Sequence, residues 1–237
     1  MDFSVFDSPE ALALNKARMD HLESIGLAVQ GKSVLEVGCG VGNLSGWWLK
    51  RKCSVFAVDA RSSNLTEALK RNPELSGCTC NMEIDLESLI WGLVGGVYRI
   101  KGQPKVAYDI VFCYGLLYHL ENPLKALRNM AAACSQLLLI ETIVCDSAAP
   151  ILLLHPEDSS NVNQGVTELS TVPSIPFLTK ALWTLGFYLY LPKNPPDHPD
   201  FQWSRCNDLS IAHPPYNHRA VVIGSRTRLD LPTLIGW

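Results

Sequence analysis

The sequence predicts an α/β fold, a doubly wound and mainly parallel sheet of seven strands with helices on both faces. Two observations lead to this fold class. Short apolar segments, typical of buried strands, alternate with helical segments between about residue 31 and residue 145. A turn with three glycines also joins the first strand directly to the helix that follows it. Alternation of this kind favours crossovers between parallel strands.

The opening segment predicts a helix. Ser8 is a typical N-cap residue, Pro9 suits the first helical position, and Gly26 ends the helical pattern. We therefore expect residues 1–30 to form an N-terminal helical cap.

Residues 31–145 hold the predicted core of the fold. Its five expected strands are residues 33–37, 54–58, 79–84, 110–114 and 136–141. Its expected helices are residues 44–51, 64–70, 86–93 and 123–133. The last helix has the clearest start signal, because Asn122 can cap it and Pro123 follows at the first position.

The C-terminal part has a different pattern. Residues 146–173 are rich in Ser, Asn, Asp and Pro without clear periodicity, so we expect a lid-like insertion there. In residues 174–225 we expect a helix capped by Ser174, strands at 187–191 and 220–224, and a second irregular insertion at 192–218. No linker or internal repeat interrupts the chain, so residues 1–237 are expected to form a single domain.

The composition and net charge disfavour nucleic acid and membranes as partners. Apolar residues make up 47% of the chain, charged residues 18%, and the net charge is −3. This charge gives no general attraction to nucleic acid or to anionic lipid, and no apolar run is long enough to span a bilayer. The scattered cysteines, without zinc-site spacing, predict reduced thiols in a cytoplasmic protein. The sequence contains no signature of an oligomeric state.

The glycine turn is the most informative motif. Residues 34–43 read Val-Leu-Glu-Val-Gly-Cys-Gly-Val-Gly-Asn, so a buried strand runs into Gly38, Gly40 and Gly42. Glycines let the backbone come close to a ligand, and the next helix offers free N–H groups to an anionic group. A dinucleotide-binding turn would place its third glycine at the position of Asn43.

Two acids follow neighbouring strands of the predicted sheet. Asp59 follows the second strand, where its carboxylate could accept both hydrogens of a ribose diol. Asp85 ends the predicted third strand, where it could accept from an adenine amine. Either acid alone could instead cap a helix or lie in a solvated loop. Because ligands of such sheets lie beyond the carboxyl ends of the strands, we expect these groups to converge on one crevice.

With these motifs, residues 30–142 resemble the class I S-adenosylmethionine-dependent methyltransferases. The resemblance implies the strand order 3-2-1-4-5-7-6, with the last strand antiparallel. It implies a cofactor site in which the glycine loop holds the methionine part, Asp59 the ribose, and residues after the second and third strands the adenine. The residues assigned to this site are Glu36, Gly38, Cys39, Gly40, Gly42, Asp59, Ala60, Asp85 and Leu86.

The end of the fourth strand lies beside the transferable methyl group in that family, which adds Cys113 and Tyr114 to the expected cofactor site. The run Tyr118-His119-Leu120-Glu121-Asn122-Pro123 resembles a narrower branch. That branch includes tRNA wobble-uridine carboxymethyltransferases and methyltransferases of sugars and other small molecules.

Three further residues carry hypotheses with alternatives. His119 could act as a general base, or could pack over the adenosine or bond to the next helix. Glu141 could accept a proton or bind an acceptor hydroxyl, or could make a structural bond to the lid. Arg18 could bind the cofactor carboxylate, or could lie on a solvated face. Glu141 and Asp146 do not reproduce a magnesium-binding acid cluster, so no metal is expected.

The predicted function is therefore methyl transfer from S-adenosylmethionine, with S-adenosylhomocysteine as product, to the oxygen or nitrogen of a small polar acceptor such as a sugar or natural-product intermediate. Two enzymatic alternatives stay open: an RNA-modifying methyl- or carboxymethyltransferase, and an NAD-dependent oxidoreductase. Asn43 and Glu36 disfavour the oxidoreductase, and the small basic clusters at 50–52 and 70–71 disfavour the RNA enzyme. A binding module that has lost catalysis is a further alternative.

Overall fold

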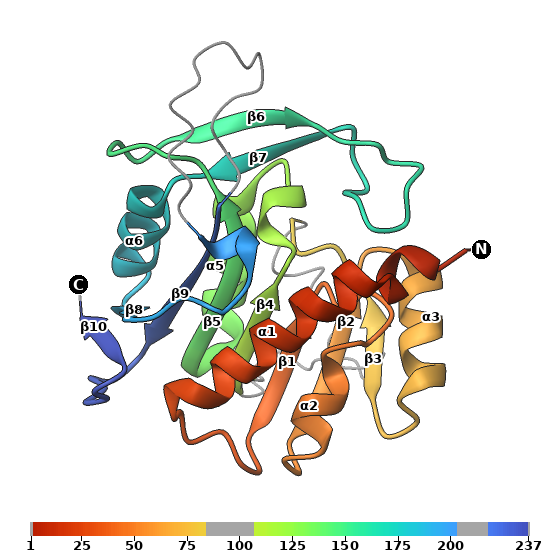
Figure 1. Cartoon of the computed structure of the whole chain (residues 1–237), viewed down its shortest axis with the longest axis horizontal. Helices are drawn as coiled ribbons and strands as arrows, with labels where there is room; N and C mark the ends of the chain where they lie inside the picture. The colour runs from red at the N-terminus through yellow and green to blue at the C-terminus, as the bar shows by residue number, and fades with distance from the viewer. Residues whose placement is uncertain (1, 84–106, 203–217, 237) are drawn as a thin grey trace, which may run out of the picture.

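The computed structural model describes residues 2–83, 107–202 and 218–236 (Figure 1). Its main sheet has the order β10-β8-β9-β5-β4-β1-β2-β3. The strands from β3 to β5 run parallel, and β9, β8 and β10 each pair antiparallel with their neighbours. Their bounds are β1 Ser33–Val37, β2 Ser54–Asp59, β3 Ser76–Thr79, β4 Tyr108–Tyr114, β5 Cys134–Val144, β8 Tyr188–Pro192, β9 His218–Ser225 and β10 Leu234–Gly236.

Helices cover both faces of this sheet. They are α1 Pro9–Ile25, α2 Ser45–Leu49, α3 Ser62–Arg71, α5 Pro123–Ala133 and α6 Ile175–Thr184, with short 3₁₀ turns η1 Ser4–Asp7, η2 Leu117–His119 and η3 Pro199–Phe201. One apolar cluster joins α5 and α6 to one face of the sheet, and a second joins α1, α2 and α3 to the other face. In Figure 1, α1 runs across the front of the sheet. The predicted doubly wound α/β fold is therefore confirmed.

The capping residues act as the sequence indicates. Ser8 accepts the backbone N–H of Ala11 at the start of α1, and Gly26 ends that helix with a φ of 81°. Asn122 caps α5 by accepting the N–H of Lys125. Each cap satisfies a backbone group that the helix itself leaves without a partner.

The sheet differs from the prediction in two places. The strand order 3-2-1-4-5-7-6 is present as β3-β2-β1-β4-β5-β9-β8, but β10 adds an eighth strand at the edge. With three residues, β10 is too short to give a periodic signal. The third strand is Ser76–Thr79, so the expected strand at 79–84 is wrong. The expected helix at 86–93 lies outside the described residues.

The composition of the insertion at 146–173 suggested an irregular segment, but the insertion is regular. It forms a two-stranded antiparallel sheet of β6 (Leu152–Pro156) and β7 (Leu169–Pro173), joined by residues 157–168, which we call the hairpin loop. Figure 1 shows this hairpin lying across the end of the main sheet at which β1, β4 and β5 finish. Prolines at the ends of both strands hide the alternation that would have predicted them.

In the second insertion, at 192–218, the described residues include η3, and β9 already begins at His218. None of the helices that the structure describes is both long and apolar enough to cross a membrane.

Ser174 provides a test of how the hairpin is joined to α6. Its fully buried hydroxyl accepts the N–H groups of Phe177 and Ile151 and donates to the carbonyl of Ala149. Ser174→Ala should lower the free energy of unfolding by about 2 kcal/mol, because it removes a cap and leaves buried groups without partners. Urea denaturation measures this loss. The matched Ser8→Ala variant removes one cap bond and should cost about 1 kcal/mol; equal losses would contradict the expectation.

Candidate active site

The glycine loop turns the chain sharply between β1 and α2. Gly38, Gly40 and Gly42 have φ values of 71°, 54° and 80°, a region that other residues rarely adopt. The N–H groups of Gly38 and Cys39 donate to the carbonyl of Val58, which ties the loop to β2. The backbone of this loop is thus held rigidly at the carboxyl end of the sheet.

Asp59 connects this loop to the start of α3. One carboxylate oxygen accepts the N–H of Gly40 at 2.9 Å, and the other accepts the N–H of Arg61 at 2.8 Å and the amide of Asn64 at 3.4 Å. Burial raises the pKa of Asp59, although these hydrogen bonds partly oppose the shift. Since each carboxylate oxygen can accept two hydrogen bonds, the oxygen that binds the Gly40 N–H retains one lone pair for a ligand.

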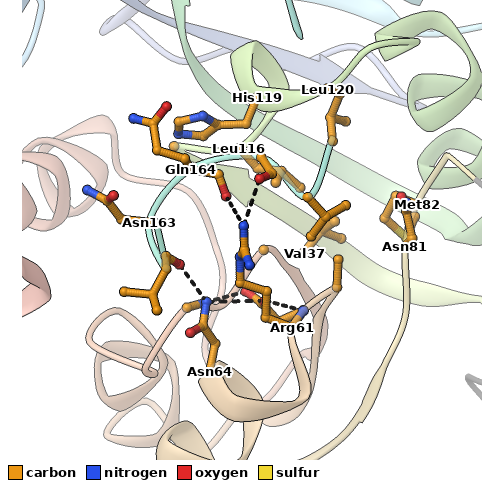
Figure 2. A pocket seen from close by; sticks show the side chains of 18 of the residues that line it. Val37, Arg61, Asn64, Asn81, Met82, Leu116, His119, Leu120, Asn163 and Gln164 are labelled. Carbon is orange, nitrogen blue, oxygen red and sulfur yellow. Dashed lines mark hydrogen bonds between the residues drawn. The ribbon is translucent and has the colours of Figure 1, made fainter. Parts of the chain in front are cut away.

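A first cavity lies between the ends of β1 and β2 and the hairpin loop. Figure 2 shows the side chains of Arg61, Asn64, Asn81 and His119 around it. Its complete wall consists of Phe6, Val37, Gly38, Gly40, Asp59, Ala60, Arg61, Asn64, Cys80, Asn81, Met82, Gly115, Leu116, His119, Leu120 and residues 162–166. The cavity therefore has an acid, apolar side chains and amide groups around one space at the sheet edge.

A second cavity lies between α1 and the glycine loop. It shares six residues with the first wall, namely Phe6, Gly38, Gly40, Gly115, His119 and Asn163, so the two cavities adjoin. Arg18, Tyr114, Tyr118 and Arg219 line the rest of its polar surface. The Tyr114 hydroxyl and Arg18 Nε are buried, and neither has a hydrogen-bond partner within the described part of the chain.

Behind the second cavity, two arginines share one buried acid. Arg18 donates to one oxygen of Glu141 at 2.6 Å, and Arg219 donates to the other at 3.1 Å. Glu141 is fully buried and belongs to neither cavity wall. Arg219 also bonds to Asp200 and to the hydroxyl of Tyr118. Glu141 thus holds two guanidinium groups in place beside the cavity.

His119 lies where the two cavities meet. Its Nδ1 is 2.9 Å and 3.1 Å from the two carboxylate oxygens of Glu157 in the hairpin loop. The hairpin loop is in turn held by Arg61, which donates to the carbonyl of Ser159. Arg61 also donates to the carbonyl of Gly165, and Asn64 donates to that of Val162 (Figure 2). Residues on three separate segments therefore enclose this junction.

The structure brings most of the predicted site residues to these cavities. Gly38, Gly40, Asp59, Ala60 and His119 line the first one, and Cys39, Tyr114 and Arg18 line the second one. Arg18 is only 7% exposed, so the alternative of a solvated face is wrong.

Other predicted residues lie elsewhere. Glu36, Gly42 and Cys113 belong to neither wall. Glu36 accepts the hydroxyl of Ser45 beneath the loop, and a Cβ at Gly42 would lie 2.6 Å from the Asn72 amide. Asp85 and Leu86 lie outside the described residues. Because β3 ends at Thr79, the described residues that line the cavity directly after this strand are Cys80, Asn81 and Met82.

Sequence reasoning missed four polar residues of the site. Arg61 and Asn64 follow Asp59 within five residues, and their position at the same strand end is a signal that could have found them. Glu157 and Arg219 come from segments without a recognisable motif, so only the fold reveals them. No group of three or more His, Cys, Asp or Glu that could hold a metal ion occurs in residues 2–83, 107–202 and 218–236.

Glu36 should make stability depend on pH. Burial raises the pKa of its carboxyl from the ordinary 4.5 to about 7, with only Ser45 opposing the shift. A raised acid pKa stabilises the fold below pH 4.5, and this contribution is lost as pH rises to 7. Relative to Glu36→Gln, the wild type should lose on the order of 3 kcal/mol of unfolding free energy between pH 4.5 and pH 8. Urea denaturation without ligand measures this difference. If the difference in unfolding free energy between the wild type and Glu36→Gln did not change with pH, the expectation would be contradicted.

Comparison with known proteins agrees with this architecture. Residues 11–191 match the family described as a methyltransferase domain. The ubiquinone biosynthesis O-methyltransferase of Pasteurella multocida is 28% identical over 125 residues, which cover 53% of this chain and 49% of that protein. The chain spans about half the length of the curated relatives it matches.

Solved structures share the fold at low sequence identity. The N-terminal domain of EvdMO1, crystallised with SAH and D-fucose, is 17% identical with a TM-score of 0.62, over 92% of this chain and 84% of that one. An S-adenosylmethionine-dependent methyltransferase from Mesorhizobium loti is 14% identical with a TM-score of 0.59, over 89% and 98%. The match to a methyltransferase family leaves no support for the NAD-dependent alternative. The chain thus belongs to the methyltransferase-domain family, and its fold is that of the class I S-adenosylmethionine-dependent enzymes.

Proposed function

We propose that this protein transfers the methyl group of S-adenosylmethionine to a small polar acceptor, with an acceptor oxygen favoured over nitrogen. The observation that carries the proposal is the pair of adjoining cavities, which meet at the glycine loop and at His119. One cavity has the groups that suit a nucleoside, and the other has the groups that suit a charged amino-acid end. This division fits the two halves of the cofactor.

The residues of the first cavity fit an adenosine. Asp59 offers its remaining lone pair to a ribose hydroxyl, and Ala60, Asn81 and Met82 supply small, amide and apolar groups around the base. In the second cavity, the unpartnered Arg18 Nε and Tyr114 hydroxyl suit a carboxylate. The glycine loop lies between these regions with its backbone exposed to both.

Several relatives support a small acceptor. The curated ones are named as ubiquinone biosynthesis O-methyltransferases, and one structural neighbour was crystallised with D-fucose. Another neighbour is a 1,6-didemethyltoxoflavin-N1-methyltransferase with its acceptor bound. The wall around Tyr118, His119 and Arg219 is polar and partly aromatic, which suits an acceptor with hydroxyl groups.

When bound, the cofactor supplies an activated methyl on a positively charged sulfur, so the protein mainly aligns the acceptor with it. We assign to His119 the removal of the acceptor proton. His119 Nε2 would take the proton of the acceptor hydroxyl as its oxygen receives the methyl group, which the bound cofactor would supply as it becomes S-adenosylhomocysteine. Glu141 keeps Arg18 and Arg219 in position and remains away from the reacting atoms.

The surface charge gives less support to an RNA substrate. Arg51 is paired with Glu23, and Arg71 with Asp7 and Glu67, so the basic clusters near 50–52 and 70–71 are partly neutralised. A linear fall of RNA affinity with salt would restore that alternative. Seven cysteines of the described chain are free thiols, which supports the proposed cytoplasmic location.

Cofactor binding is tested by calorimetric titration with S-adenosylhomocysteine. The wild type should bind it, and Asp59→Asn should weaken binding about 10- to 100-fold, because charge-assisted hydrogen bonds to the ribose are lost. Asp109→Asn is the matched control: Asp109 binds Ser33 at the opposite end of the sheet, so its affinity should match the wild type. Binding of NAD in place of S-adenosylhomocysteine would overturn the proposal.

The role of His119 is tested by turnover. Purified protein is incubated with S-adenosylmethionine and a panel of deoxysugars and phenols, and released S-adenosylhomocysteine is measured. With an accepted substrate, His119→Ala should lower kcat about 100-fold or more, because the general base is gone. Its affinity for S-adenosylhomocysteine should fall far less than kcat, which separates loss of the base from loss of the cofactor site. Nearly full turnover by this variant would remove the role.

A further inference from the structure

Glu157 is the one acid whose side chain reaches His119 in the structure as described. It comes from the hairpin loop, 38 residues along the chain, and both of its oxygens lie within 3.1 Å of His119 Nδ1. The backbone N–H of Gly165 donates to the same carboxylate at 2.8 Å. Two donors from different segments thus fix its orientation.

This contact is shielded from water. The side chain of Glu157 is 2% exposed and that of His119 is 11% exposed. Burial alone would raise the pKa of Glu157, but its contact with His119 and the hydrogen bond from the Gly165 N–H outweigh this effect and lower that pKa. Glu157 is therefore an ionised carboxylate.

An ionised carboxylate can only accept hydrogen bonds, so His119 must carry its proton on Nδ1 in this contact. The neutral ring then has its lone pair on Nε2, which has no hydrogen-bond partner among residues 2–83, 107–202 and 218–236. His119 lines both cavities, so this nitrogen is available to a ligand there.

Other polar groups around this pair do not compete for Nδ1. Arg61 donates to carbonyls of the hairpin loop, and Arg219 donates to Glu141, Asp200 and Tyr118. Tyr118 stacks beside the imidazole, with ring centres 4.0 Å apart. The carboxylate of Glu157 is thus the group that sets the tautomer.

We propose that Glu157 is the positioning residue of His119, which holds the imidazole as its Nδ1–H tautomer and directs the basic Nε2 toward the acceptor. The catalytic role of Glu157 rests on the proposed methyl transfer. The tautomer of His119 does not, because it is a property of the ligand-free protein. The hairpin loop thereby contributes to the reaction chemistry as well as to the cavity wall.

The tautomer is measured by long-range ¹⁵N–¹H spectra of histidine side chains in ¹⁵N-labelled protein at pH 8, with His119 assigned from His119→Asn. The wild type should show mainly Nδ1–H. In Glu157→Ala the Nε2–H form, which the free histidine side chain prefers, should become the majority. Glu157→Gln, whose amide oxygen still accepts, should lie between them.

Two controls separate this effect from general damage. Glu168→Ala makes the same change at an exposed acid of the hairpin loop and should leave His119 unchanged. The signal of His21, buried on α1 and bonded to the carbonyl of Asn194, should stay fixed in every variant that folds correctly. A wild-type Nε2–H form, or an unchanged tautomer in Glu157→Ala, would overturn the proposal.

Kinetics extend the test once an acceptor is known. Glu157→Gln should lower kcat about 10-fold or more with little change in the KM for S-adenosylmethionine. The same substitution in a His119→Ala background should cause no further loss, since it acts only through His119. Independent losses would contradict the positioning role. Failure to bind S-adenosylhomocysteine would instead refute the proposed function and leave the tautomer result standing.

Discussion

The carboxylate of Asp59 is the interaction on which the rest of the site depends. It joins the N–H of Gly40 in the loop after β1 to the N–H of Arg61 at the start of α3. Arg61 then holds the hairpin loop through backbone carbonyls, and that loop carries the carboxylate that binds His119. A single acid at a strand end therefore organises two cavity walls, although the segments involved are distant in sequence. Its strength comes from burial, which makes each of these hydrogen bonds more costly to break.

The parts of the fold that the sequence predicts well are those controlled by neighbouring residues. β1 and α5 have the predicted bounds, because a glycine turn ends one and Asn122 with Pro123 starts the other. The third strand was misplaced because Gly77 interrupts its apolar signal. Yet a Cβ at Gly77 would lie 2.3 Å from the carbonyl of Ala57, so the absence of a side chain is what lets β3 approach β2. In the site too, features set by neighbouring residues could be predicted, and features set by distant segments could not. Asp59 ends a strand and could be predicted, whereas Glu157 depends on a hairpin that crosses the sheet edge.

The cluster of Arg18, Glu141 and Arg219 shows how electrostatics and packing combine here. Glu141 lies at a position with no solvent exposure, where an isolated charge would be very unfavourable. Two guanidinium groups, from α1 and β9, satisfy its two oxygens. Because removal of one partner would leave another charge buried and uncompensated, these three residues act as one unit. They also connect the first helix to a late strand, so the N-terminal cap is part of the site and not an appendage to it.

The N-terminal turn η1 has a practical consequence for work with this protein. Phe6 lines both cavities, and its carbonyl accepts a hydrogen bond from the amide of Asn43. The guanidinium of Arg71 donates two hydrogen bonds to the carboxylate of Asp7. A bulky fusion that displaces η1 would pull Phe6 from the wall of both cavities. β10, near the other terminus, lies at the far edge of the sheet (Figure 1). Immobilisation for binding assays is therefore better placed at the C-terminal end.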